Sequence, residues 1–223
     1  SLPPPAVLHP SIDLQRNPQL EACAADATTT TTLVSINRFE RKKALELAIH
    51  ALRRLRSSSG SKRGGRDVRL VMAGGYDDRL RENVDYYIEL ERLITEGGME
   101  GVITLKRNVS EDERRTLFSE CAAVVYTPSY EHFGIVPLEA MAAGRPVIAV
   151  NLGGPCESIV HGESGWLCEP TPDAFAAAFA EVAELDRTGK LAARGKAARE
   201  RVEGHFSLQA FGEKLETHLK AVC

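Results

Sequence analysis

The sequence has no long hydrophobic run. Across its 223 residues, no apolar stretch approaches the roughly 18 consecutive residues that a membrane-spanning helix needs. The opening Ser-Leu-Pro-Pro-Pro also lacks the basic and apolar regions of a signal peptide. We therefore expect a chain that is soluble by itself.

The sequence also lacks an excess of charge of either sign. Its 28 Lys and Arg residues and 31 Asp and Glu residues leave a formal net charge of −3. This balance excludes the broad basic field that attracts nucleic acid or anionic lipid. Any phosphate must therefore be bound by a few individually placed cations.

Patterns that bind metals are missing as well. The five cysteines include no Cys-x-x-Cys pair, Asp-x-Asp does not occur, and no cluster of His, Cys, Asp or Glu has the spacing of metal ligands. We expect no protein-bound metal or cofactor. The scattered cysteines are expected to be reduced thiols that serve as small buried side chains.

What the sequence does have is a regular alternation that begins near residue 30. Short β-branched or aliphatic runs alternate with amphipathic stretches, which is typical of a parallel sheet covered by helices. The predicted strands span residues 32–36, 68–73, 102–105, 123–126, 146–150 and 165–167. The predicted helices span residues 42–56, 82–95, 110–119, 137–143, 172–186, 189–203 and 207–223.

This alternation predicts an α/β fold, a Rossmann-like, doubly wound parallel sheet of about six strands with C-terminal helices. The domain is expected to cover residues 31–223, including a helical tail after the last strand. Residues 1–30 contain several prolines and a threonine run, and they are expected to be an interdomain connector.

Ligands of such sheets bind beyond the carboxyl ends of the strands, so the loops that leave the strands are the places to search for a site. The first of these loops contains Arg38, and Lys43 is expected in the first turn of the following helix. A cation there opposes the helix dipole unless an anion lies nearby. A solvated basic turn paired with Glu40 explains the same pattern equally well. Gly74, after the second strand, allows a ligand to approach the backbone but also fits an ordinary turn.

The loop after the fourth predicted strand is the most informative. It runs from Glu131 into a helix that is expected to begin at Pro137 and to end before Gly144. The N–H groups of residues 134–136 precede this helix, lack helical acceptors and are available to a phosphate or sugar oxygen. Glu139, in the expected first turn, could accept two ribose hydroxyls. Two alternatives stay open, in which Glu139 only complements the helix dipole and Glu131 is an exposed loop charge.

Together these residues resemble the retaining GT-B glycosyltransferases of family 4. That family has an arginine and a lysine after the first strand and two glutamates that enclose seven residues, which here are Arg38, Lys43, Glu131 and Glu139. The loops at residues 153–159 and 162–167 also resemble those of the family, and the likeness spans roughly residues 34–167. The resemblance implies a two-domain enzyme in which this chain is the C-terminal, donor-binding half and an N-terminal domain outside the chain contacts the acceptor.

The resemblance also implies a role for each site residue. Arg38 and Lys43 would neutralise a diphosphate, and Glu131 would hold the hydroxyls of the transferred sugar. Glu139 would hold the ribose. The remaining nucleotide-sugar contacts would come from Phe133, Gly134, Ile135, Val136, Gly74, Arg107 and Val109.

Within the family, the motifs at residues 36–43, 74–77 and 126–135 are most similar to eukaryotic mannosyltransferases that assemble dolichol-linked oligosaccharides. This likeness implies GDP-mannose as the donor and a dolichyl-diphosphate-linked Man-GlcNAc2 glycan as the acceptor. It also implies a location at the cytosolic face of the endoplasmic reticulum, with membrane contact through regions outside this chain. The alternatives are another GT-B nucleotide-sugar enzyme, such as a UDP-sugar transferase or an epimerase, and a non-catalytic nucleotide-binding domain.

Overall fold

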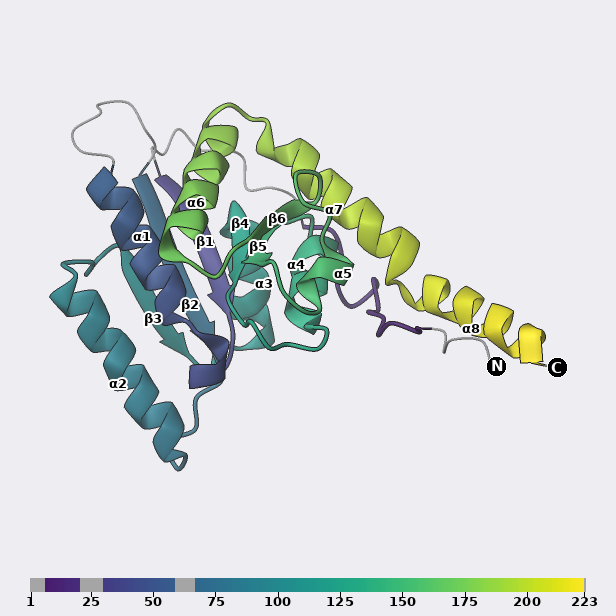
Figure 1. Ribbon diagram of the computed structural model, residues 1–223, viewed down its shortest axis with the longest axis horizontal. Helices are drawn as coiled ribbons and strands as arrows, with labels where there is room; N and C mark the ends of the chain where they lie inside the picture. Colours follow the sequence, from purple (N-terminus) through teal and green to yellow (C-terminus); the bar gives the residue numbers. More distant parts are fainter. Residues whose placement is uncertain (1–6, 21–29, 59–66, 223) are drawn as a thin grey trace.

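Six parallel strands form one sheet in the order β3-β2-β1-β4-β5-β6 (Figure 1). The computed structural model describes residues 7–20, 30–58 and 67–222. The strands are β1 (Thr30–Ile36), β2 (Asp67–Gly74), β3 (Ile103–Arg107), β4 (Ala123–Tyr126), β5 (Val147–Val150) and β6 (Gly165–Cys168). The strand order reverses between β1 and β4, which makes their carboxyl ends the switch point of the sheet. The predicted Rossmann-like, doubly wound class is therefore confirmed.

The helices cover both faces of this sheet. They are α1 (Glu46–Ser58), α2 (Arg81–Glu96), α3 (Glu111–Glu120), α4 (Ile135–Ala142), α5 (Pro155–Ser158), α6 (Pro172–Arg187), α7 (Leu191–His205) and α8 (Leu208–Val222). The short α5 was not predicted, whereas all seven predicted helices are present. In Figure 1, α1 and α6 lie side by side on one face of the sheet, and α8 extends beyond the sheet.

Two apolar layers result, one on each face of the sheet. The first packs α1, α2 and α6 on the sheet, and the second packs α3, α4 and α7 on the other face. Neighbouring strand residues alternate between the layers, as Val124 and Val125 do in β4. Because both faces are covered, the strands are apolar at nearly every position.

The first helix differs from the prediction. A short 3₁₀ turn (Arg41–Lys43) is followed by Ala44 in the left-handed conformation, at φ 47° and ψ 45°, and α1 begins only at Glu46. The prediction that Lys43 lies in the first turn of this helix is therefore wrong. The break lets Phe39 and Leu45 enter the core on either side of the turn, and the Tyr86 hydroxyl accepts a hydrogen bond from the Leu45 N–H at 2.7 Å. Tertiary contacts thus override the helix propensity of alanine.

The start of α4 also differs from the prediction. This helix begins at Ile135, so Pro137 is its third residue and not its first, and Glu139 is its fifth, beyond the first turn. Proline is tolerated there because the first N–H groups of a helix have no acceptor anyway. The predicted end is confirmed, since Gly144 has a φ of 77° immediately after the C-cap.

Residues 7–20, part of the expected connector, pack against the domain. The Ile12 N–H donates to the Phe206 carbonyl at 2.9 Å, and the Leu20 N–H donates to the Ala143 carbonyl at 3.3 Å. Arg199 of α7 donates to the Asn17 carbonyl at 2.9 Å. This stretch therefore lies along α4 and the junction between α7 and α8. Its role as a link to another domain stays a prediction, and residues 1–6 and 21–29 lie outside the described residues.

Three cysteines lie in the described part of the chain and carry free thiols. Cys121 and Cys168 are buried as expected, but Cys156 is exposed, so the prediction of a buried side chain is wrong there. Cys23 and Cys223 lie outside the described residues. Among the helices of the described residues, none combines the length and the apolar character that crossing a membrane requires.

The contact between α4 and α7 yields a testable prediction about stability. A Cβ atom on Gly195 of α7 would overlap the carbonyl oxygen of Gly144, whereas a Cβ atom on Gly204 of the same helix meets nothing within 4 Å. Alanine normally stabilises a helix by about 0.5–1 kcal/mol relative to glycine. We expect Gly204→Ala to show that gain and Gly195→Ala to lower the free energy of unfolding by about 1–3 kcal/mol instead. Urea unfolding of both variants checks this, and equal effects would contradict the close packing of α4 on α7.

Candidate functional site

The centre of the site is an ion pair between the loops that follow β1 and β4. The Lys43 ammonium pairs with Oε2 of Glu131, although the two residues lie 88 positions apart in the chain. Their side chains are only 13% and 29% exposed, so water screens the pair less than it would a surface pair. The Tyr126 hydroxyl donates to the same carboxylate oxygen at 3.2 Å.

A second contact ties the Lys43 turn to the end of β4. The hydroxyl of the fully buried Thr127 donates to the backbone carbonyl of Lys43 at 2.6 Å. Backbone and side chain of Lys43 are thus both held by the segment that leads from β4 to Glu131. The structure therefore brings together Lys43 and Glu131, which the sequence proposes as partners in one site.

The loop after β5 supports the Glu131 loop from behind. The Gly154 N–H donates to the Glu131 carbonyl at 3.0 Å. A Cβ atom on Gly153 would lie 2.6 Å from that carbonyl oxygen, and one on Gly154 would overlap the backbone of Phe133. Only glycine permits such a close approach of two backbones. These two glycines open the 153–159 motif that the family resemblance includes.

Phe133 is anchored by aromatic neighbours from distant parts of the chain. Its ring centre lies 5.6 Å from that of His9 and 5.8 Å from that of Phe206. His9 also contacts the Glu157 carboxylate at 2.6 Å. The side chain of Phe133 therefore has a structural role, and only its backbone fits the role that the sequence analysis assigns to it.

The three N–H groups of Gly134, Ile135 and Val136 precede the hydrogen-bonded part of α4. None of them donates to another described residue. Gly134 has a φ of 81°, and a Cβ atom there would lie 2.8 Å from the Tyr126 hydroxyl. Ile135 is 42% exposed. The α4 N-terminus therefore presents donors to an anion next to the Lys43–Glu131 pair.

Arg38 is not part of this ion pair. Its side chain is 63% exposed and contacts Glu40 at 2.9 Å, and Lys42 contacts the other oxygen of the same carboxylate at 2.9 Å. In the described part of the chain, no ion pair or hydrogen bond joins Arg38 to Glu131. Arg38 and Lys42 thus fit the alternative of a solvated basic turn paired with Glu40. Lys43 does not fit it, because its partner is Glu131.

Gly74 lies where β2 meets the loops after β1 and β3. Its φ is 155°, a Cβ atom would overlap the Asn37 carbonyl, and its own carbonyl accepts from the Asn108 N–H at 2.8 Å. Asn108 has a φ of 52°, and its side-chain amide bonds both the N–H and the carbonyl of Tyr76 at 2.7 and 2.8 Å. Sequence reasoning missed Asn108, although asparagine tolerates positive φ better than most residues.

Arg107 stacks on two aromatic rings at the end of β3. Its guanidinium lies 4.9 Å from the ring centre of Tyr76 and 5.1 Å from that of Tyr87. An open hollow of about 700 Å³ lies beside this stack and is lined by Tyr76, Asp77, Asp78, Arg79, Arg107 and Asn108. The side chain of Val109, by contrast, packs against the apolar layer beneath α3 and α4. Of these two predicted residues, only Arg107 faces an open space.

Glu139 pairs with a residue that sequence reasoning missed. Its carboxylate forms an ion pair with Arg114 of α3, and the two side chains are 16% and 20% exposed. Burial raises the pKa of Glu139 above its ordinary value, even though the Arg114 charge acts in the opposite direction. Because Glu139 lies beyond the first helical turn, complementing the helix dipole does not explain it.

Electrostatics separate the two glutamates. Partial burial alone would raise the pKa of Glu131, but the hydrogen bond and charge of Lys43, assisted by Tyr126 and Lys42, outweigh it and lower the pKa. Burial is the main cause that raises the pKa of the Tyr126 phenol, and the charge and hydrogen bond of Glu131 raise it further. The phenol therefore stays a proton donor. Glu131 is thus an anion held between two donors, whereas Glu139 is a carboxylate whose ionisation depends on Arg114.

No group of three or more His, Cys, Asp or Glu side chains within residues 7–20, 30–58 and 67–222 is arranged to hold a metal ion. The expectation that the protein itself binds no metal stays a prediction.

Residues 23–201 match the family described as glycosyl transferases group 1. The chain belongs to this family. It is 47% identical over 182 residues to the α-1,3/1,6-mannosyltransferase ALG2 of Mus musculus and 47% identical over 183 residues to that of Homo sapiens, in each case covering 82% of this chain and 43% of the relative. ALG2 of Dictyostelium discoideum is 44% identical over 191 residues, with coverage of 84% and 45%. The chain thus spans less than half the length of these relatives.

Solved structures agree on the fold. Sucrose-phosphate synthase from Thermosynechococcus elongatus superposes with a TM-score of 0.77 at 23% identity, covering 96% of this chain and 52% of that protein. Anabaena HepE in complex with UDP and glucose gives 0.77 at 21% identity, and a glycosyltransferase from Rickettsia africae gives 0.80 at 20% identity, each covering 97% of this chain and 57% of the other. The GT-B half-fold and the family expected from the sequence are both confirmed.

The Lys43–Glu131 pair predicts a change in titration. Glu131 contributes stability that is complete above its ordinary pKa of 4.5 and is lost as the pH falls through its lower folded pKa. Lys43→Met should raise the pKa of Glu131 and flatten this loss of stability in acid. NMR titration of ¹³C-labelled glutamate carboxyls measures the shift. Lys42→Met is the matched control, because that ammonium pairs with Glu40 and acts on Glu131 only as a weaker, more distant charge, so its shift should be smaller. An equal shift in both variants would contradict the specific pair.

Proposed function

We propose that this chain is the donor-binding half of a retaining α-1,3/1,6-mannosyltransferase that uses GDP-mannose. The observation that carries the proposal is the Lys43–Glu131 pair beside the N–H groups of residues 134–136, which have no acceptor among the described residues. A cation, an anion and an anion-binding helix end thus meet at the switch point of the sheet, where such folds bind nucleotides. The mannosyl group itself follows from the names of the ALG2 relatives.

Departure of GDP develops negative charge on the diphosphate. Lys43 and the N–H groups of residues 134–136 would stabilise that charge more strongly in the transition state than in the ground state. Arg38 would join them from the exposed loop after β1. In this structure Glu40 contacts both Arg38 and Lys42. When Arg38 turns toward the phosphates, Glu40 would therefore still have Lys42 as its partner.

Glu131 would bind the hydroxyls of the transferred sugar. Its Oε2 accepts from Lys43 and Tyr126, and Oε1 has no partner among the described residues. One oxygen thus fixes the side chain while the other is available to mannose. The anionic charge would also support the cationic character that the sugar gains as the bond to GDP breaks. Retention of configuration is part of the proposal, and we assign no covalent nucleophile.

The nucleoside would extend from the phosphates along the ends of β2 and β3. Glu139 would accept the ribose hydroxyls, and Gly74 would allow the nucleotide to approach the backbone closely. The stack of Arg107 on Tyr76 and Tyr87 beside the open hollow supports a place for the base there. Because the side chain of Val109 packs in the apolar layer, only its backbone would contact the nucleotide.

The acceptor and the membrane would be contacted outside this chain. The match covers only 43% of the ALG2 relatives, and the remaining part would supply most contacts to a dolichyl-diphosphate-linked Man-GlcNAc2 glycan. The proposed location is the cytosolic face of the endoplasmic reticulum, in the assembly of the N-glycan precursor.

One observation favours a second candidate. The structurally similar HepE binds UDP and glucose in its crystals, so a UDP-sugar enzyme on the same half-fold is the alternative. The two candidates differ in the base and the sugar of the donor.

Titration calorimetry on this chain with GDP, GDP-mannose, UDP and UDP-glucose distinguishes them. We expect the two guanosine ligands to bind and the Arg38→Ala, Lys43→Ala double variant to weaken them by about tenfold or more, because hydrogen bonds to charged groups contribute about 1.5–3 kcal/mol each. Arg187→Ala, Lys196→Ala removes the same charge from exposed positions on α6 and α7 and serves as the control. Tighter binding of UDP-glucose would support the second candidate, and no binding of any nucleotide would refute both.

Mannosyl transfer by the complete protein tests the role of Glu131. Glu131→Ala should reduce transfer to a dolichyl-linked acceptor by about two to three orders of magnitude, as the loss of one transition-state contact does elsewhere. Its affinity for GDP should change only a few fold, because Glu131 is assigned to the sugar. Glu163→Ala removes an exposed carboxylate and should leave both quantities unchanged. Full transfer by Glu131→Ala would refute the assignment of Glu131 to the transferred sugar.

A further inference from the structure

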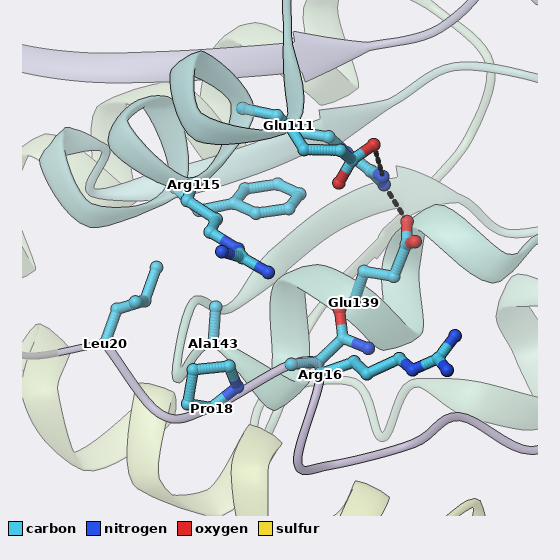
Figure 2. A pocket seen from close by; sticks show the side chains of 10 residues that line it. Arg16, Pro18, Leu20, Glu111, Arg115, Glu139 and Ala143 are labelled. Carbon is cyan, nitrogen blue, oxygen red and sulfur yellow. Dashed lines mark hydrogen bonds and ion pairs between the residues drawn. The ribbon is translucent and has the colours of Figure 1, made fainter.

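Arg114 and Glu139 form an ion pair between two helices that the sequence gives no reason to associate. The residues lie 25 positions apart, on α3 and α4, and Arg114 Nη2 contacts Oε2 of Glu139. In Figure 2 the carboxylates of Glu111 and Glu139 converge on one place beside a small cavity, and Arg114 forms an ion pair with each of them. The carboxylate proposed to bind ribose therefore already has one oxygen occupied.

The guanidinium of Arg114 is itself held in place. It lies 5.5 Å from the ring centre of Phe118, one helical turn further along α3, and its Nη1 lies 3.7 Å from Glu111. Its Nε is buried without a hydrogen-bond partner among the described residues. Ring stacking and two carboxylates thus fix the planar group, which makes it a defined support for Glu139.

The rest of the surroundings leaves Glu139 little freedom. The cavity measures about 30 Å³, room for roughly one water molecule. Asn17, Pro18 and Leu20 of the N-terminal segment line it together with Ala143 (Figure 2). The carboxylate therefore cannot move far to find another partner on this side.

Two other cations line the cavity but do not replace Arg114. Arg16 contacts Asp13 at 3.5 Å, and Arg115 contacts Asp112 at 3.8 Å. Neither makes an ion pair with Glu139 among the described residues. Arg114 is thus the cation that compensates the buried charge, and an unpaired carboxylate at this exposure would be protonated more readily.

Vicinal hydroxyls are donors, and they are bound best by an ionised carboxylate with an open acceptor oxygen. We propose that Arg114 is a positioning residue for the nucleotide ribose, which holds Glu139 ionised and leaves its Oε1 to accept the 2′ and 3′ hydroxyls. This inference rests on the proposed function. It adds to that function a further cation, one that touches no substrate atom and acts only through Glu139.

The test compares GDP with 2′,3′-dideoxy-GDP, which lacks both hydroxyls. In the unchanged chain, the dideoxy ligand should bind at least about tenfold more weakly. Arg114→Met should weaken GDP selectively, so that the ratio of the two dissociation constants falls to within about threefold. Arg114→Lys keeps the charge and should retain most of the ratio. A merely structural role of Arg114 would weaken both ligands equally.

Glu139→Gln serves as the reference variant, and thermal unfolding checks that every variant is folded. If Arg114→Met does not fold, Arg114→Gln and Arg114→Lys supply the same comparison. A ratio that stays high without Arg114 but falls in Glu139→Gln would overturn the positioning role. A ratio that survives in Glu139→Gln would overturn the ribose assignment while leaving nucleotide binding intact. Failure of every nucleoside diphosphate to bind would instead refute the proposed function itself.

Discussion

The ion pair between Lys43 and Glu131 is the contact on which the rest of the site depends. It joins the loops that leave β1 and β4, the two strands at which the direction of the sheet order reverses. Because neither side chain is fully in water, the attraction between the two charges is screened less than in a surface pair. It places a cation, an anion and the N-terminus of α4 within one small region.

The packing around this pair explains how its geometry is fixed. Thr127 holds the backbone of Lys43, Tyr126 holds the carboxylate, and Gly153 and Gly154 let the loop after β5 support the Glu131 loop. These contacts come from the ends of β4 and β5 and hold the loops after β1 and β4, so the site exists only when these three strand ends are assembled. The same holds for Glu139, whose ionisation depends on a neighbouring helix and on a cavity closed by the N-terminal segment.

Most of the fold was predictable from local patterns. Strands covered on both faces are apolar at nearly every position, so their ends were found to within about two residues. Two predicted helix starts are wrong, at Ala44 and Pro137, where local preference competes with packing. The turn at Ala44 bends to bury Phe39 and Leu45, and Pro137 sits inside the first turn of α4, where its missing N–H does no harm.

By itself the sequence determined the fold class, the family and the two loops that meet, because strand hydrophobicity, glycine positions and the spacing of Glu131 and Glu139 are local properties. Only the tertiary structure decided which charges pair. It joined Lys43 to Glu131, left Arg38 with Glu40, and gave Glu139 to Arg114. The physical reason is that an ion pair depends on distance and burial, and these arise from contacts between segments that lie far apart in the chain.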